Sequence, residues 1–256
     1  MANNMFSNQN AASAARAVDD SSLLLKKTFN CPCCDGIFKN EVVKSGRARQ
    51  IGQDIDLRPH CEGVDPLKYG VIVCPDCGYA ALSNCFGKIT SSQIKFVKEK
   101  ITSSYTGYNL YNEMTYDDAI ARHKLALLNS MACGSKVSER AYLCLLIGWL
   151  MRANAELEKV DDDPNVQQEI KAYLKKAGDG FRTAYAQERF PICGMDENTF
   201  VYLLAALDYE TGEYEEALKW ASKLISSNNT IERIKERARE IRNLAKTGLG
   251  VSGNDN

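Results

Sequence analysis

Residues 29–38 read FNCPCCDGIF, and residues 73–81 repeat the same arrangement as VCPDCGYAA. Each stretch contains a C-P-x-C unit, Cys31 with Cys34 and Cys74 with Cys77, and a glycine soon follows the second cysteine. A C-P-x-C turn places two sulfurs on one side of a tight loop, and the glycine lets the backbone bend so that its amides face the thiolates. The two stretches therefore predict a pair of metal-binding knuckles.

Two such knuckles brought together supply four sulfurs in a tetrahedron, which is the arrangement that Zn²⁺ prefers in structural sites. We predict that the metal ligands are Cys31, Cys34, Cys74 and Cys77. The 39 residues that separate Cys34 from Cys74 exceed the roughly 15–20 of a compact knuckle pair. An insertion of strands explains this length, because EVVKSGRARQI and DIDLRPH alternate as strands do and YGVIV leads directly into the second knuckle.

Two alternatives to zinc remain open for these cysteines. Iron also accepts four thiolates in a tetrahedral, rubredoxin-like site, where it would carry an electron. A single C-x-x-C unit can instead act as a redox-active thiol pair, but such a pair usually precedes a helix that lowers a thiol pKa, and neither unit begins a long helical pattern. A disulfide is disfavoured, because the first 27 residues contain no signal-peptide pattern and we expect a cytoplasmic protein.

The other cysteines and histidines are weaker candidates. Cys33 lies inside the first knuckle and is expected to point away from the metal. His60 and Cys61 are adjacent in LRPHCEG, and they would complete the site only if a knuckle sulfur were missing. Four further cysteines have apolar or loop surroundings and are predicted to be small buried residues: Cys85, Cys133, Cys144 and Cys193.

After about residue 90 the sequence changes to helical periodicity. SSQIKFVKEKI predicts a connecting helix that follows the knuckle module. LLAALDYETGEYEEALKWASKLI then follows the tetratricopeptide pattern, with Ala205 and Ala217 where two helices approach closely and Gly212 between the helices. The later half of the chain is therefore predicted to be helical.

The second-helix pattern recurs in TYDDAIARHKLALL and YLKKAGDGFRTAY, and Gly148 takes the small-residue position of the middle repeat. The spacing between these copies exceeds the ideal of about 34 residues, so the repeats are degenerate. The predicted fold class is α+β, a small β zinc-ribbon-like module followed by an all-α tetratricopeptide-like repeat domain. The predicted boundaries are a disordered tail over 1–22, the module over 23–90, the repeats over 91–247 and a second tail over 248–256.

Composition limits the classes of function. The chain has 256 residues, a net charge of -1 and 25% charged residues, which argues against a strong phosphate-binding surface. No apolar run approaches the roughly 18 residues of a membrane span, so no membrane partner is expected. The sequence has no phosphate-binding loop, dinucleotide-binding glycine motif or H-E-x-x-H, and His123 occupies a repeat position that is usually packed. We predict that the protein is not an enzyme.

Several stretches taken together resemble a known family: CPCCDGIF, GRARQIGQDIDLRPHCEGVDPLKYGVIVCPDCGYAA, FPICGMDENTFVYLL and GEYEEALKWASKLI. They resemble a bacterial family of uncharacterised cytoplasmic proteins, a domain of unknown function in which a cysteine-knuckle N-terminus precedes tetratricopeptide-like repeats. The resemblance extends from residue 25 to about residue 245 and implies architecture and bacterial origin, but no activity. Asp35 departs from the pattern, because a glycine is expected directly after Cys34, and Cys33 is an extra cysteine.

The leading hypothesis is a zinc-binding, non-enzymatic adaptor that holds a partner protein or peptide in the groove of its helical repeats. Tyr202 and Tyr209 of the last repeat would face this groove and contact the partner, or alternatively serve only in packing. A second hypothesis is nucleic-acid binding by the ribbon. It would use five basic residues among interleaved acidic ones: Lys39, Lys44, Arg47, Arg49 and Arg58.

Overall fold

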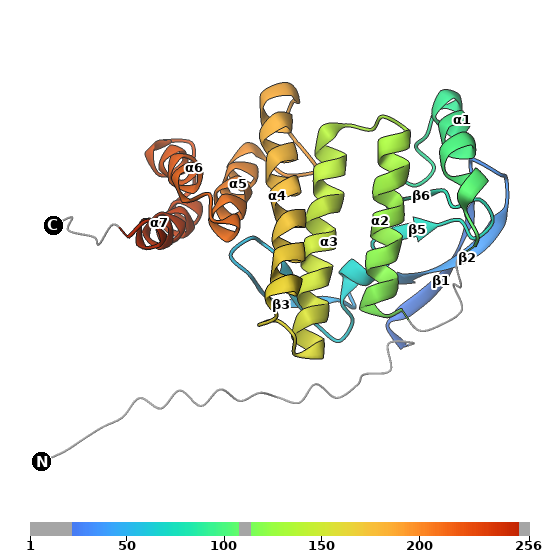
Figure 1. The fold of residues 1–256 in the computed structure, drawn as a ribbon, viewed down its shortest axis with the longest axis horizontal. Coiled ribbons are helices and arrows are strands. Elements are labelled where there is room, and N and C mark those ends of the chain that lie inside the picture. Colours follow the sequence, from blue (N-terminus) through green and yellow to red (C-terminus); the bar gives the residue numbers. More distant parts are fainter. Residues whose placement is uncertain (1–21, 108–113, 251–256) are drawn as a thin grey trace, which may run out of the picture.

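The computed structural model describes residues 22–107 and 114–250, and within them short strands come first and helices follow (Figure 1). This order confirms the predicted α+β class. The predicted tails over 1–22 and 248–256 lie mostly outside the described residues. The strands form antiparallel hairpins: β1 (Leu24–Asn30) with β2 (Ile37–Val43), β3 (Arg49–Gln53) with β4 (Pro59–Glu62), and β5 (Val71–Val73) with β6 (Ala80–Leu82).

The two cysteine knuckles are the turns of the first and third hairpins. In the first, the amide of Cys31 donates to the carbonyl of Gly36 at 2.9 Å. In the third, the amide of Cys74 donates to the carbonyl of Tyr79 at 2.8 Å, which closes a turn of the same length. The repeat in the sequence is therefore also a repeat in the backbone.

The helices of the described residues form a row in which α2, α3 and α4 lie side by side, joined by short turns (Figure 1). None of them is both long and apolar enough to cross a bilayer. Their bounds, with two 3₁₀ helices, are η2 (Pro66–Tyr69), α1 (Ser91–Lys100), η3 (Thr102–Ser104), α2 (Tyr116–Ala132), α3 (Val137–Glu158), α4 (Pro164–Gln187), α5 (Glu197–Thr211), α6 (Tyr214–Ser226) and α7 (Glu232–Gly248).

Gly148 allows α3 and α4 to pack closely, as its place in the repeat pattern predicts. A β-carbon at this position would come within 2.7 Å of the Leu174 side chain on α4. With α5 the two helices enclose a large buried cluster, in which Leu145, Phe181 and Phe200 are almost completely buried. Close backbone approach and apolar burial together hold the centre of the helical row.

The strand hairpins and the helices share their apolar core. Val71, Val73 and Ala80 of the third hairpin form one buried cluster with Ala126 of α2 and Leu143 of α3. The predicted boundary at residue 90 therefore separates two kinds of secondary structure, while side-chain packing continues across it.

The β3–β4 hairpin extends away from the knuckles, and we call residues 49–62 the arm and residues 54–58 its tip. In Figure 1 the arm runs past α3 and α4, and its tip lies beside α5. Every residue of β3 is exposed, whereas Asp56 and Arg58 at the tip are buried. The arm is thus attached to the helices mainly through its tip.

Candidate metal centre

The structure brings together the four cysteines that the sequence singles out. Their sulfur atoms all lie within 4.8 Å of one another. Cys31 Sγ is 3.5 Å from Cys77 Sγ, and Cys34 Sγ is 3.6 Å from Cys74 Sγ. Four sulfurs bound at about 2.3 Å to one ion would be about 3.8 Å apart, whereas a disulfide needs about 2.05 Å. The donors and their spacing therefore fit a tetrahedral metal ion.

Each close sulfur pair joins the two knuckles, because one member comes from residues 31–34 and the other from residues 74–77. A bound ion would consequently tie the β1–β2 hairpin to the β5–β6 hairpin. Since such a site does not exist in the unfolded chain, the free energy of metal binding contributes to folding.

The thiols of the cluster interact closely with one another. The backbone amide of Cys33 donates to Cys31 Sγ at 3.4 Å. Hydrogen bonds from the side chains of Cys33, Cys74 and Cys77 lower the pKa of Cys31 well below its ordinary range, and the hydrogen bond to Cys31 raises the pKa of Cys77. The sulfurs thus lie close enough to shift one another's pKa, and a divalent ion would bind them as thiolates.

The surroundings of the cluster are apolar on one side. Cys31, Cys74 and Cys77 are buried, and Cys34 is exposed. Four aromatic rings with centroids 5.0–6.0 Å apart pack beside the buried sulfurs: Phe29, Phe38, Tyr79 and Phe86. This shell limits the access of water to three of the four sulfurs.

Asp35 and Gly78 occupy equivalent positions, one residue after the second cysteine of each knuckle. Their φ angles are 60° and 73°, both in the left-handed region. This conformation explains why a glycine is expected there, and aspartate is one of the few other residues that adopt it readily. The departure at Asp35 therefore leaves the geometry of the first knuckle unchanged.

We expect Gly78→Ala to lower the free energy of unfolding by more than about 1 kcal/mol, because a side chain at positive φ is strained. A β-carbon there would also come within 2.7 Å of the Tyr105 side chain. The matched variant Asp35→Gly should leave stability unchanged or raise it. Denaturant unfolding of the metal-loaded proteins measures both effects, and a Gly78→Ala protein as stable as the parent would refute the equivalence of the two knuckles.

The structure places the weaker candidates outside the cluster. His60 and Cys61 lie on β4, and the His60 ring is bonded to the Asp54 carboxylate. Cys33 is 2% exposed and packs in the apolar cluster beside the knuckles. It is not among the four sulfurs that lie within 4.8 Å of one another, but its side chain contacts Cys31, so the expectation that it points away from the metal stays a prediction.

His123 is a core residue, as its repeat position predicts. Its side chain is completely buried, and Nδ1 donates to the carbonyl of Ala119 at 2.7 Å. Burial lowers the pKa of His123 to about 4, so the ring is neutral near pH 7.

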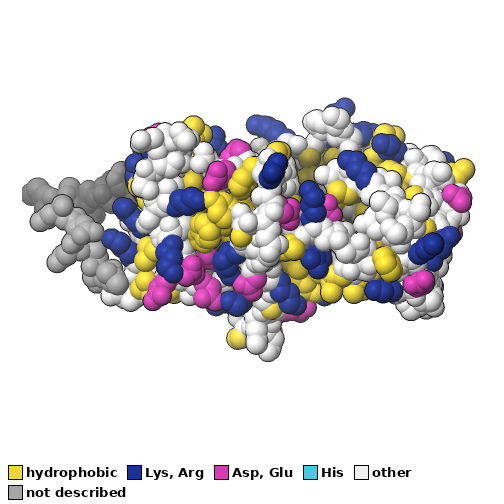
Figure 2. All heavy atoms as spheres, turned by 90° about the horizontal axis from the view of Figure 1, so that it is seen from above, with side chains coloured by type: hydrophobic (Ala, Val, Ile, Leu, Met, Phe, Trp, Pro, Cys, Tyr) yellow, Lys and Arg dark blue, Asp and Glu magenta, His cyan; other side chains and the backbone are white. Residues whose placement is uncertain are grey.

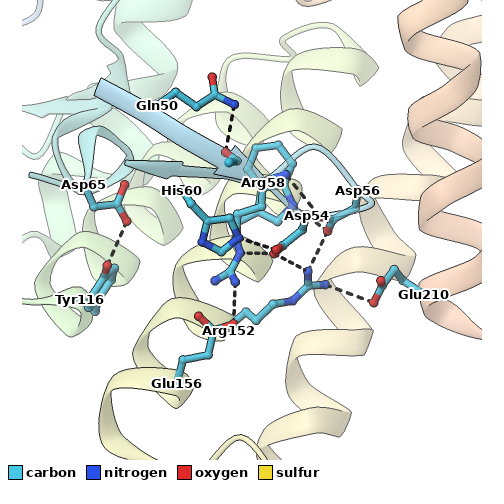
Figure 3. Close-up of polar contacts among 12 residues, drawn as sticks. Gln50, Asp54, Asp56, Arg58, His60, Asp65, Tyr116, Arg152, Glu156 and Glu210 are labelled. Atoms are coloured by element: carbon cyan, nitrogen blue, oxygen red, sulfur yellow. Dashed lines mark hydrogen bonds and ion pairs between the residues drawn. The ribbon is translucent and has the colours of Figure 1, made fainter. Parts of the chain in front are cut away.

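A polar network at the tip of the arm, drawn in Figure 3, is not predicted from the sequence. Its one signal in the sequence is the alternation of acidic and aliphatic residues in DIDLRPH, a pattern that also predicts a strand. Its members come from the tip, from α3 and from α5: Asp54, Asp56, Arg58, Arg152, Glu156 and Glu210.

Asp56 is the most deeply buried member of this network, with no exposed surface. Trp149 Nε1 donates to its Oδ2 at 2.8 Å, and the Arg152 guanidinium lies 3.2 Å from the same oxygen. A buried carboxylate is tolerated only when it is paired and hydrogen-bonded in this way.

Asp54, which is partly buried, forms a second ion pair within the tip, with Arg58. Although burial opposes it, hydrogen bonds from His60 and Arg58 lower the pKa of Asp54. Arg58 is 4% exposed and also binds Glu156 of α3. Arg58 is therefore not available to a nucleic acid. The nucleic-acid hypothesis was wrong to include it among the basic residues of the binding surface. Figure 2 shows a face on which Lys and Arg side chains lie among Asp and Glu side chains.

Tyr202 is also covered by the tip. It is 3% exposed, and its hydroxyl donates to the carbonyl of Ile55 at 2.8 Å. The Arg237 guanidinium stacks 4.6 Å above its ring and donates to the carbonyl of Asp54 at 3.4 Å. The prediction that Tyr202 faces an open groove is wrong, because the chain's own arm fills that place. Tyr209 is half-buried beside Tyr214, and its contact with a partner stays a prediction.

The fold and this centre define a class of protein, α+β chains in which two cysteine knuckles face each other beside a row of helices. The chain belongs to the family described as an uncharacterized protein conserved in bacteria (DUF2225), which it matches over residues 24–245. The resemblance stated from the sequence is thereby confirmed. No curated protein and no solved structure matches the chain.

Proposed function

We propose that this chain is a zinc-binding, non-enzymatic adaptor that captures a partner protein or peptide on its helical surface. Four cysteine ligands would fill the coordination sphere of Zn²⁺, as in structural sites, whereas catalytic zinc keeps a position for water. The ion would then hold the two knuckle hairpins together and perform no reaction. Cys31, Cys34, Cys74 and Cys77 are the residues that would bind it.

One observation carries the partner-binding part of this proposal: helices α3, α5 and α7 already hold a polypeptide segment, the tip of the arm. In a tetratricopeptide-like arrangement these would be the helices whose faces line the groove. Tyr202 and Arg237 bind main-chain carbonyls of the tip, as groove residues of such domains bind a peptide.

A hollow of about 390 Å³ adjoins the tip and would receive the partner. It lies between α3, α4 and α5, and Arg152 and Glu210 form part of both the hollow and the polar network. Lys171 of α4 adds an exposed positive charge, whereas Leu174 beneath it is buried in the core. The positive charge suits a segment with acidic side chains.

The partner-binding proposal predicts that a random peptide library displayed on phage yields specific binders to the intact protein. Lys171→Glu should weaken their binding at least tenfold, because it reverses a charge in the hollow. The matched variant Lys219→Glu changes an exposed lysine of α6 outside the hollow and should leave binding unchanged. Failure to enrich peptides, or equal binding by both variants, would contradict the proposal.

The zinc proposal predicts one zinc ion per chain and no visible absorption in protein purified without added metal or chelator. Metal analysis and an absorption spectrum measure this directly. Iron with visible thiolate bands would overturn the proposal and favour electron transfer, the rubredoxin-like alternative.

A further inference from the structure

The arm depends on its docked tip. In the described part of the chain, β3 and β4 pair only with each other, and Ile51 of β3 is 64% exposed. An isolated two-stranded hairpin is marginally stable in water. The contacts of the tip therefore decide where the arm lies.

The tip presents a preformed turn to the helices. The amide of Asp54 donates to the carbonyl of Arg58 at 2.9 Å, and the amide of Leu57 donates to the carbonyl of Asp54 at 3.1 Å. Leu57 has a φ of 71°, a left-handed conformation that is costly for a leucine in a free chain. The surface formed by α3, α5 and α7 thus fits a hairpin that already contains this turn better than it fits a flexible peptide.

The surface that receives the tip, formed by α3, α5 and α7, is rich in polar groups. Trp149, Arg152, Tyr202 and Arg237 provide its hydrogen bonds and ion pairs. Arg152 is also 3.4 Å from Glu210 of α5, so it keeps an ionic partner when the tip leaves. Ile55 and Leu57 of the tip also pack against the apolar clusters of the helices, so the contact is partly polar and partly apolar. Contacts of this mixed kind are typical of parts of one chain that move relative to each other.

Two glycines flank the arm and supply hinges. Gly46 and Gly63 have φ angles of 71° and 83°, and no atom lies within 4 Å of a β-carbon built at Gly46. Rotation at these glycines would swing the arm outward without breaking the metal centre. A second copy of this chain then offers the same receiving surface, and it is the partner certain to carry the matching turn.

We propose that two copies of this chain exchange arms, so that residues 54–58 of each dock on the α3, α5 and α7 surface of the other. This association goes beyond the capture of a partner in the adjoining hollow. The exchange preserves every contact of the tip, and protein concentration therefore sets the balance between the closed monomer and the exchanged dimer.

A charge-reversal mixture tests the proposal with the full-length chain. Asp56→Arg reverses a charge on the tip and leaves the receiving surface unchanged. Arg152→Asp reverses the opposing charge on the receiving surface and leaves the tip unchanged. Each variant alone should be monomeric by light scattering. Mixed in equal amounts, they should elute with twice the mass of one chain, because each tip then meets an oppositely charged residue only on the other variant.

The control mixture pairs Arg49→Asp with Glu62→Arg, which reverses an exposed ion pair inside the arm and should add no dimer. Metal analysis of each variant checks that its two knuckles still bind an ion. Monomers in the charge-reversal mixture would overturn the proposal.

If either variant loses its metal, the exchange of arms is tested with wild-type protein instead. Heavy-isotope and normal copies are mixed and examined by native mass spectrometry at rising concentration. Mixed dimers that increase up to about 1 mM, the effective concentration of a short tether, would support exchange. Monomers alone over this range would refute it.

Discussion

Replacing Cys74 by serine is expected to abolish stoichiometric metal binding and to lower the free energy of unfolding by several kcal/mol. Structural zinc contributes roughly 10–16 kcal/mol of apparent binding free energy in small zinc-finger peptides. The loss here should be smaller than that, because an apolar core also supports the third hairpin. Metal analysis and denaturant unfolding of the purified variant measure the two effects.

The damage from Cys74→Ser should reach the helices. Thr102 Oγ1 donates to the carbonyl of Cys77 at 2.9 Å, and Asn129 of α2 donates to the carbonyl of Gly78 at 3.0 Å. Distortion of the second knuckle therefore disturbs buried hydrogen bonds of the helical half.

Cys61→Ser is the matched control for this experiment, since Cys61 is a partly buried cysteine outside the cluster. It should keep one metal ion per chain and the stability of the parent. A Cys74→Ser protein with a full metal complement and an unchanged unfolding midpoint would disprove the assignment of the centre.

The second large effect is expected at Asp56. Asp56→Ala should lower the free energy of unfolding by about 3–5 kcal/mol, the range found when one partner of a buried charge pair is removed. Trp149 would lose its hydrogen-bond acceptor, and Arg152 would lose a buried counter-charge. Urea unfolding monitored by circular dichroism measures the loss.

Asp56→Asn separates the two contributions, because an amide oxygen still accepts from Trp149 while the negative charge is gone. The free energy of unfolding of Asp56→Asn should lie between that of the parent and that of Asp56→Ala. Asp162→Ala removes an exposed carboxylate from the turn before α4 and serves as a control with no expected effect. Equal stability of Asp56→Ala and Asp162→Ala would show that the network does not hold the arm.

The clustering of the four cysteines could be predicted from the sequence because each knuckle is local. The four residues of a C-P-x-C turn set the distance between its two sulfurs. The second copy of this turn, which begins at Cys74, identifies the other knuckle of the pair. The positive φ of Asp35 could also be inferred, since its equivalent in the second knuckle is Gly78. Short-range rules of turn geometry were sufficient for this part of the structure.

The docking of the arm could not be predicted in the same way. Helical periodicity placed Tyr202 on an inner face, but it carries no information about what covers that face. The covering group, the carbonyl of Ile55, is 147 positions away along the chain. The same limit applies to the core, where Val71 and Leu143 meet across the predicted boundary.

The metal centre also has a consequence for chain entropy. A bound ion would join Cys31 to Cys77, 46 positions apart, and the whole arm lies between these two residues in the sequence. Such an ion would act as a cross-link, and closing a loop of this size removes unfolded-state entropy worth about 4 kcal/mol by the polymer relation used for disulfides. The knuckles would then keep the base of the arm together even when its tip is released.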